Sequence, residues 1–262
     1  MITRSLILAA GKGTRMNSDL PKVLHPLRGR PMILYAIEAA SAATGHPPIL
    51  VIGHGAEQVR AAGLALSRGL SLSKPEAEGG RVPQYVYQAQ QLGTGHAVRQ
   101  AEELLCGQTD LVLITSGDMP LFRAETLREL ILLQEGNTGP LSIITVIADD
   151  PRGFGRIVRD AAGRVQAIVE EADASPAQRA IRELNVGAYC VSDAWLWRAL
   201  REIRVSPKGE YYLTDLVGIA VQQGQPIQTL EMAEPGGAIG INTPQHLAEA
   251  EQILAHRLGS PA

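Results

Sequence analysis

The amino-acid sequence predicts an α/β fold of the Rossmann-like kind, in which helices flank a mixed, mainly parallel sheet that carries a small antiparallel layer. Short apolar runs alternate with helical patterns through the first half of the chain, as expected for a parallel sheet with helices on both faces. After Pro140 this alternation gives way to consecutive β-rich stretches, which indicate the antiparallel layer. With 262 residues, 45% of them apolar, the chain is long enough for one large α/β domain or for a domain with a small lobe.

Four predicted strands and four predicted helices alternate in the first half. The strands are expected at residues 5–9, 49–52, 84–87 and 110–115, and the helices at residues 31–43, 56–66, 96–105 and 124–134. Residues 68–83, rich in Ser, Gly, Glu and Pro, are expected to form an exposed loop. Because ligands bind beyond the carboxyl ends of the strands in such sheets, the residues that directly follow each strand are expected to carry function.

The second half begins with the predicted antiparallel layer, which spans about residues 141–191 and is expected to form one wall of a cleft. Its β-rich stretches are residues 141–148, 156–169 and 184–191, with no strong helix between the first two. Further elements are helices at residues 193–202 and 212–223, a strand at residues 227–232 and a closing helix at about residues 244–257. The pattern therefore predicts one domain over residues 1–242, followed by a C-terminal helix within residues 243–262.

Charge and cysteine content exclude several classes of function. The chain has 24 Lys and Arg residues and 27 Asp and Glu residues, which gives a formal charge of −3. It therefore lacks the excess of positive charge that sequence-independent binding to nucleic acid requires. Its two cysteines, Cys106 and Cys190, exclude a disulfide framework and a cysteine-based zinc site. The apolar run at residues 6–10 is too short for a signal peptide, and no run approaches the ~20 residues of a membrane span. We therefore expect a cytoplasmic protein whose partners are neither nucleic acids nor membranes.

Glycines and cations gather directly after the first predicted strand. Gly11 and Gly13 leave backbone N–H groups open to an anion, and Lys12, Arg15 and Lys22 add three cations close by. The pattern is neither a Walker loop nor a dinucleotide fingerprint, and prolines at positions 21, 26 and 31 prevent a helix from starting at the glycines. It predicts an extended loop that wraps over a polyphosphate, whereas two glycines alone would favour an ordinary turn with solvated cations.

A second polar segment, residues 88–98, follows the third predicted strand. Gln88 and Gln91 offer amide donors and acceptors that match the edge of a uracil ring, while the two glycines after them keep the backbone bare enough for a flat base. The alternative is a loop that leads into a helix near His96, with Thr94 as the helix cap and His96 in a structural role. The residues alone leave both interpretations open.

Two further positions are candidates for metal ligands. Asp118 follows a buried apolar strand by three residues, where a carboxylate can face the cleft and bind Mg²⁺. A role for Asp118 as a helix cap is disfavoured because Pro120 and Phe122 place the start of the next helix further on. Asn242 stands beside the start of the last predicted helix, and Asn242 or Thr243 would serve as its cap.

The motifs resemble those of a known family. Residues 8–16, Leu-Ala-Ala-Gly-Lys-Gly-Thr-Arg-Met, with Pro-Lys at positions 21–22, are similar to the signature of the nucleotidyltransferases that join a nucleoside triphosphate to a sugar 1-phosphate. From about residue 5 to residue 242 the chain most resembles the uridylyltransferase half of the bifunctional N-acetylglucosamine-1-phosphate uridyltransferases. The resemblance implies a fold of the nucleotide-diphospho-sugar transferase type, with uracil bound at residues 88–98.

The reaction implied by the resemblance condenses UTP with N-acetylglucosamine 1-phosphate to UDP-N-acetylglucosamine and pyrophosphate. The attacking phosphate oxygen is already ionised at pH 7, so alignment and charge neutralisation replace a general base. By resemblance Arg15 and Lys12 hold the β- and γ-phosphates, Lys22 bridges the α-phosphate and the sugar phosphate, and Asp118 and Asn242 hold Mg²⁺. Arg15 and Lys22 are the implied catalytic residues. The implied substrate-binding residues are Leu8, Ala9, Ala10, Gly11, Lys12, Gly13, Gln88, Gln91, Gly93, Thr94, Gly117, Gly155, Glu170 and Asn185.

Three positions depart from the family pattern on the sugar side. Ser116 stands where Tyr is often found, Ala172 where Lys is common and Val186 where Thr is common. These departures leave open another sugar 1-phosphate, of the glucose or galactosamine type. A non-catalytic nucleotide-sugar sensor is a further alternative, against which the joint presence of the cationic and metal-binding residues argues. Residues 208–216 match another family segment and are expected only to support the local helix.

The bifunctional relatives continue into a left-handed β-helix that forms trimers and transfers acetyl groups. Here about twenty residues follow Asn242, and they are predicted to form one amphipathic helix. We therefore expect no acetyl-CoA chemistry from this chain, and a monomer or weak oligomer in place of the trimer.

Overall fold

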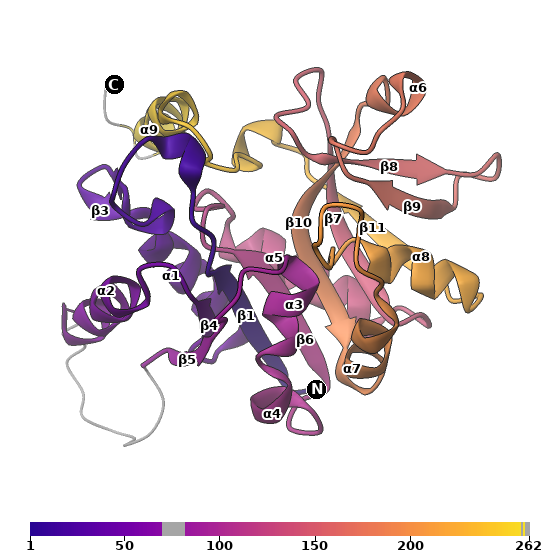
Figure 1. The fold of residues 1–262 in the computed structure, drawn as a ribbon, viewed down its shortest axis with the longest axis horizontal. Helices are drawn as coiled ribbons and strands as arrows, with labels where there is room; N and C mark the ends of the chain where they lie inside the picture. Colours follow the sequence, from indigo (N-terminus) through magenta and orange to yellow (C-terminus); the bar gives the residue numbers. More distant parts are fainter. Residues whose placement is uncertain (70–81, 258, 260–262) are drawn as a thin grey trace.

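The computed structural model describes residues 1–69, 82–257 and 259, and a nine-stranded sheet forms its centre (Figure 1). Seven strands follow the order β11-β7-β10-β6-β1-β4-β5, and β8 and β9 are joined to β10. The strands are β1 (Thr3–Ala9), β4 (Ile49–Ile52), β5 (Gln84–Tyr87), β6 (Leu111–Ser116), β7 (Leu141–Ile147), β8 (Gly155–Arg159), β9 (Val165–Val169), β10 (Glu183–Ser192) and β11 (Ile227–Glu231). The predicted strands are confirmed to within two residues, except that residues 156–169 form two strands.

Helices cover both faces of the parallel part of the sheet. β1 pairs in parallel with β4 and β6, and β4 with β5. Leu6 and Ile7 of β1 point to opposite faces, yet both are fully buried. The face of Ile7 is covered by α1 (Met32–Thr44), α2 (Ala56–Gly69) and α5 (Ala124–Glu135). The face of Leu6 is covered by α3 (Thr94–Arg99), α4 (Glu102–Leu105), α7 (Asp193–Glu202) and α8 (Asp215–Gln222).

The antiparallel strands belong to the main sheet and do not form a layer of their own. β10 runs antiparallel to β6 and β7, and β11 pairs in parallel with β7. Only the hairpin of β8 and β9 projects from the sheet, and it pairs with Leu184 and Asn185 of β10. Of the strands within residues 141–191, which were expected to form one wall of a cleft, only those of this hairpin therefore stand out from the main sheet. Strand β10 is ten residues long, so it pairs with β6 at one end and with β8 at the other.

Several elements differ in extent from the prediction. The helix expected at residues 96–105 is divided into α3 and α4, and the helix expected from residue 212 begins at Asp215. Most of the predicted loop at residues 68–83 lies outside the described residues. Short elements that were not predicted are η1 (Thr14–Met16), η2 (Lys22–Leu24), β2 (Pro26–Leu27), β3 (Arg30–Pro31), α6 (Pro176–Arg179) and η3 (Pro235–Gly237). No described helix is long and apolar enough to span a membrane.

The last helix, α9 (Pro244–Arg257), packs against the beginning of the chain (Figure 1). Ala250 is fully buried in an apolar cluster with Met16, Leu27 and Ile241. This packing brings the turn before α9 to the carboxyl ends of β1 and β6, the edge where a ligand is expected.

Candidate active site

The phosphate loop, residues 10–16, begins where β1 ends. Gly13 has a φ of +63°, and its carbonyl accepts a hydrogen bond from the Met16 N–H at 3.0 Å, which closes the short helix η1. A β-carbon on Gly13 would collide with the Lys22 side chain, so glycine here also lets that lysine pass. Lys12 and Arg15 are exposed. The loop therefore exposes backbone groups and cationic side chains and does not start an α-helix, as predicted from the prolines that follow it.

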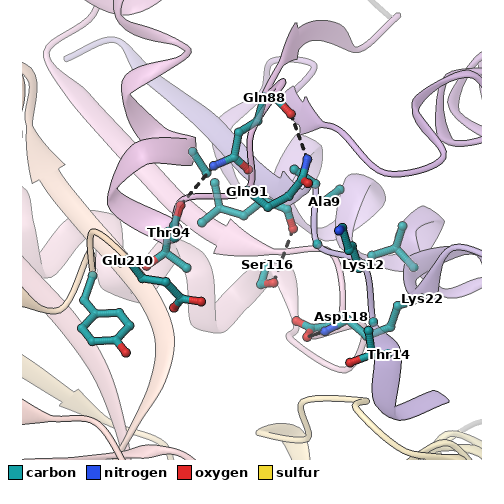
Figure 2. Close-up of a pocket in the computed structure, with 18 of the residues that line it drawn as sticks. Ala9, Lys12, Thr14, Lys22, Gln88, Gln91, Thr94, Ser116, Asp118 and Glu210 are labelled. Atoms are coloured by element: carbon teal, nitrogen blue, oxygen red, sulfur yellow. Dashed lines mark hydrogen bonds and ion pairs between the residues drawn. The ribbon is translucent and has the colours of Figure 1, made fainter. Parts of the chain in front are cut away.

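Lys22 lies at the centre of a polar network that joins distant parts of the chain, and Figure 2 shows its side chain near Asp118. Its Nζ donates to a carboxylate oxygen of Asp118 and, at 3.0 Å, to Oδ1 of Asn242. Arg15 Nη2 donates to the same Asn242 oxygen at 2.9 Å. The Ile241 N–H donates to the Asp118 backbone oxygen at 2.9 Å and so holds Asn242 beside Asp118. Four predicted phosphate- and metal-binding residues thus meet in one place.

The structure separates the roles of Asn242 and Thr243. Thr243 Oγ1 accepts a hydrogen bond from the His246 N–H at 3.2 Å, so Thr243 caps α9. Asn242 donates from Nδ2 to the Gly240 carbonyl at 3.2 Å, which orients its Oδ1 toward Lys22. Asn242 is therefore not needed as the helix cap, and its oxygen is directed into the site.

The ligand set at this point fits Mg²⁺. Burial raises the pKa of the Asp118 carboxyl, but the charge of Lys22 and hydrogen bonds from Lys22 and Ser116 outweigh burial and hold that pKa below its usual value. Mg²⁺ takes carboxylate and other oxygen ligands from proteins and completes its shell with water and substrate phosphates. Because the Lys22 ammonium lies between the Asp118 and Asn242 oxygens, a cation can occupy the space that these two oxygens share.

Gln88 and Gln91 follow β5 and use their amide hydrogens within their own loop (Figure 2). Gln88 Nε2 donates to the Gly93 carbonyl at 3.1 Å and lies 2.9 Å from His96 Nδ1, and Gln91 Nε2 donates to the Gln88 carbonyl at 3.0 Å. Among the described residues, neither Oε1 accepts a hydrogen bond. The two side chains can therefore offer acceptors to a base, whose own acceptors would need backbone N–H groups. Burial and the charge of Arg99 lower the pKa of His96, in keeping with its structural role.

The two glycines after these glutamines have a packing role that the sequence did not suggest. A β-carbon on Gly93 would lie 2.6 Å from the Tyr211 carbonyl oxygen, and one on Gly95 would lie 3.1 Å from it. The Gly95 N–H donates to that oxygen at 2.8 Å, and the Tyr211 N–H donates to the Leu92 carbonyl at 2.8 Å. These long-range hydrogen bonds draw the segment around Tyr211 onto the two glycines, so packing alone requires residues without a β-carbon here, and the binding of a base against this backbone stays a prediction.

Residues 206–214 form a wall of the site that the sequence prediction missed. The Leu213 N–H donates to Thr94 Oγ1 at 2.9 Å, so Thr94, the first residue of α3, binds this wall and does not cap the helix. Glu210 and Tyr212 line the larger of the cavities described below. The family match at residues 208–216 was the available signal, but local spacing gave no reason to place this segment against α3.

The predicted sugar-binding residues converge on the hairpin side of the site. Gly155 and Asn185 are partners in the ladder between β8 and β10. Thr214 Oγ1 donates to Glu170 Oε1 at 2.8 Å. Burial raises the pKa of Glu170; the Thr214 hydrogen bond opposes this shift, and three nearby carboxylates add to it. Asn185 Nδ2 donates to the Tyr189 hydroxyl at 2.7 Å, a partner that the sequence did not suggest.

Two adjoining cavities, of about 720 and 190 Å³, open at this edge of the sheet and share Asp118 in their linings. The predicted residues that line the larger cavity are Leu8, Ala9, Ala10, Gly11, Lys12, Gly13, Lys22, Gln88, Gln91, Gly93, Thr94, Asp118 and Glu170. The smaller cavity adds Gly155, Asn185 and Asn242. Arg15 and Gly117 line neither cavity: Arg15 contacts Asn242, and Gly117 is buried, with Val23 3.2 Å from where its β-carbon would be. The arrangement provides a polyphosphate-sized space beside a smaller one.

Comparison with known proteins gives relatives over most of the chain. Residues 5–206 match the family model of the MobA-like NTP transferase domain. Bifunctional protein GlmU of Pelotomaculum thermopropionicum is 44% identical over 255 residues, 97% of this chain and 52% of the relative. Bifunctional protein GlmU of Burkholderia lata is 45% identical over 250 residues, 95% of this chain and 51% of the relative. The chain thus spans about half the length of the curated relatives it matches.

A solved structure supports the fold independently. A crystal structure of UDP-glucose pyrophosphorylase complexed with UDP-glucose superposes with a TM-score of 0.76 and covers 98% of this chain and 100% of that one. At 17% identity, this similarity confirms the predicted fold class.

Proposed function

Because the chain belongs to the MobA-like NTP transferase family, we propose that it condenses UTP with N-acetylglucosamine 1-phosphate to UDP-N-acetylglucosamine and pyrophosphate. The observation that carries the proposal is the contact of Lys22 with both Asp118 and Asn242 where the two cavities meet. Similarity to the bifunctional GlmU proteins agrees with the resemblance of the motifs to a uridylyltransferase.

The proposed chemistry is an in-line displacement at phosphorus. An ionised oxygen of the sugar phosphate forms a bond to the α-phosphorus of UTP, and the bond from that phosphorus to the bridging oxygen breaks to release pyrophosphate. Since the nucleophile carries no proton at pH 7, the chain has to align the groups and neutralise their charge. Lys22 is partly buried between the cavities and is placed to contact the α-phosphate and the sugar phosphate, while Lys12 and Arg15 face the outer phosphates.

Asp118 and Asn242 would hold Mg²⁺ in this scheme. The metal would supply neutralisation of the charge on the phosphoryl oxygens. The Lys22 ammonium, which now pairs with both ligands, would then be available for the phosphates. Arg15 would keep contact with Asn242 or turn to the substrate, because its guanidinium is exposed.

Uridine selectivity in this proposal depends on the loop after β5. The free Oε1 atoms of Gln88 and Gln91 are acceptors for the N3–H of uracil, a donor that cytosine lacks. The inward-facing amide hydrogens hold both oxygens in place, so a change of base would require the loop to rearrange.

The test is the release of pyrophosphate from UTP, dTTP or CTP in the presence of Mg²⁺ and one sugar phosphate at a time. We expect the highest kcat/KM for UTP with N-acetylglucosamine 1-phosphate. A preference for glucose or galactosamine 1-phosphate would favour the alternative left open by Ser116, Ala172 and Val186. Calorimetric binding of nucleotide without pyrophosphate release would favour a sensor. Light scattering of the purified chain tests the accompanying expectation of a monomer or weak oligomer.

A further inference from the structure

Strand β10 carries an irregularity where it passes the smaller cavity. Its register against β7 shifts between Asn185 and Tyr189, and Gly187 between them has a φ of +75°. Residues four apart in a regular strand are separated by roughly 13 Å. The Asn185 amide nevertheless reaches the Tyr189 hydroxyl at 2.7 Å, so the bulge brings two side chains of one strand together at the site.

The hydrogen bonds around Asn185 define the direction of its amide. The Gly187 backbone N–H, which is a donor only, lies 3.2 Å from Asn185 Oδ1. The amide nitrogen of Asn185 therefore faces Tyr189 and donates to it. The Tyr189 oxygen is the acceptor in that bond, and its own proton points elsewhere.

No acceptor for the Tyr189 hydroxyl proton is present among the described residues. Tyr189 is 4% exposed and lines the smaller cavity. Burial and the negative charge of Glu170 raise the pKa of Tyr189, so the phenol keeps its proton at neutral pH. Buried polar groups in native proteins are normally hydrogen-bonded, so this donor is suited to an acceptor on a ligand.

We infer that Tyr189 determines specificity in this site, because its hydroxyl donates a hydrogen bond to an oxygen of the sugar moiety. The inference rests on the proposed function for the presence of a sugar in the smaller cavity. Glu170 lines the same cavity and its charge acts on Tyr189; since its Oε1 accepts from Thr214, its second oxygen remains as an acceptor for a ligand in that cavity. A donor and an acceptor in the same cavity suit sugar substituents that carry both kinds of group, whereas a phosphate offers acceptors alone.

The experiment compares Tyr189→Phe with the unchanged protein in calorimetric titrations with UDP-N-acetylglucosamine and with UDP. The substitution keeps the ring and removes the donor. We expect roughly tenfold weaker binding of the nucleotide sugar, the effect of one lost hydrogen bond, and UDP binding within about twofold. Tyr85→Phe is the matched control. Tyr85 lies on β5 and lines neither cavity, and its hydroxyl donates to the Arg60 carbonyl at 3.4 Å.

Two results would overturn the inference. One is unchanged affinity of Tyr189→Phe for the nucleotide sugar, and the other is an equal loss for UDP and the nucleotide sugar together with a lower Tm. Tyr189→Phe in an Asn185→Ala background separates direct donation by Tyr189 to the sugar from positioning of Asn185. A further loss of affinity for the nucleotide sugar of at least about threefold on adding Tyr189→Phe supports direct donation. No further loss of affinity contradicts it. Steady-state release of pyrophosphate by the unchanged protein tests the proposed function separately, since binding is measured without turnover.

Discussion

At the scale of single residues, Lys22 connects the charges of the site. Its side chain is 16% exposed and that of Asp118 is 13% exposed, so their charges are less screened by water than those of a surface pair. Each partner neutralises the other before a ligand arrives. A polyanionic substrate and a divalent cation can replace both contacts without leaving a buried charge unpaired.

Lys22→Ala is expected to lower kcat by about 10²–10³-fold, since a positioned group that stabilises transition-state charge contributes on that order. Circular dichroism should show the fold retained, because alanine at this position removes no core packing. Arg198→Ala, which removes an exposed cation on α7, is the control and should leave turnover unchanged. Turnover of Lys22→Ala near that of the unchanged protein would contradict the assigned role.

Glu170→Gln is expected to stabilise the fold while weakening sugar binding. The pKa of Glu170 is raised in the folded state, so ionisation of its carboxyl lowers the free energy of unfolding at pH values above that pKa. This loss of stability disappears as the pH falls below the pKa of the same carboxyl in the unfolded chain. A gain of about 1 kcal/mol in the free energy of unfolding would raise the Tm of Glu170→Gln by about 2–4 °C at pH 7.5. The Tm difference from the unchanged protein should shrink toward about pH 4. A Tm difference that is independent of pH would show that the carboxylate charge is not its cause.

At the scale of elements, the turn before α9 assigns separate tasks to adjacent residues. Thr243 caps the helix, and the helix in turn holds the Asn242 oxygen near Lys22. Strand β10 behaves similarly, because one segment of it completes the sheet while its bulge directs Asn185 into the smaller cavity. In both cases residues with a structural role lie within a few positions of a residue that faces the site.

Substitution at this turn should separate stability from activity. Thr243→Ala is expected to lower Tm by about 2–4 °C, the effect of losing a helix cap of about 1 kcal/mol, with kcat/KM within about threefold. Asn242→Ala is expected to leave Tm nearly unchanged and to lower kcat/KM by about 100-fold in limiting Mg²⁺. Thermal unfolding and pyrophosphate release measure both variants, and the reverse pattern would show that Asn242 is the cap.

At the scale of the whole molecule, the site depends on elements from both ends of the chain. The phosphate loop follows the first strand, Asn242 precedes the last helix, and the segment around Tyr211 closes over α3. A ligand that contacts these parts together binds the folded state and not the unfolded chain. Its binding free energy therefore adds to the free energy of unfolding.

UTP with Mg²⁺ is accordingly expected to raise Tm. At a concentration 100 times its Kd, the stabilisation is about 2.7 kcal/mol, or about 5–11 °C for a chain of this size. CTP at the same concentration should give a smaller shift, and Lys22→Ala should reduce the shift from UTP. Differential scanning fluorimetry measures both effects, and equal shifts from UTP and CTP would contradict uridine selectivity.

Much of the fold could be predicted because it depends on local patterns. The apolar run that became β4 and the amphipathic pattern that became α7 have the bounds expected from the sequence. The division between α3 and α4 was not predicted, because both parts share one helical periodicity and the break lies at Gln100 and Ala101. The pairing of β10 with both β6 and β7 was also not predicted, since strand pairing between distant residues leaves no mark on the composition of either strand.

The sequence by itself determined the alternation of strands and helices, the cationic glycine loop after the first strand and the acidic residue after β6, because spacing and side-chain chemistry are properties of neighbouring residues. Only the tertiary structure decided that Lys22 lies between Asp118 and Asn242, that Gly93 is packed under Tyr211 and that Tyr189 holds the amide of Asn185. These contacts depend on the docking of α9, the path of residues 206–214 and the bulge in β10. Such features are set by the packing of the whole chain, to which local periodicity is insensitive.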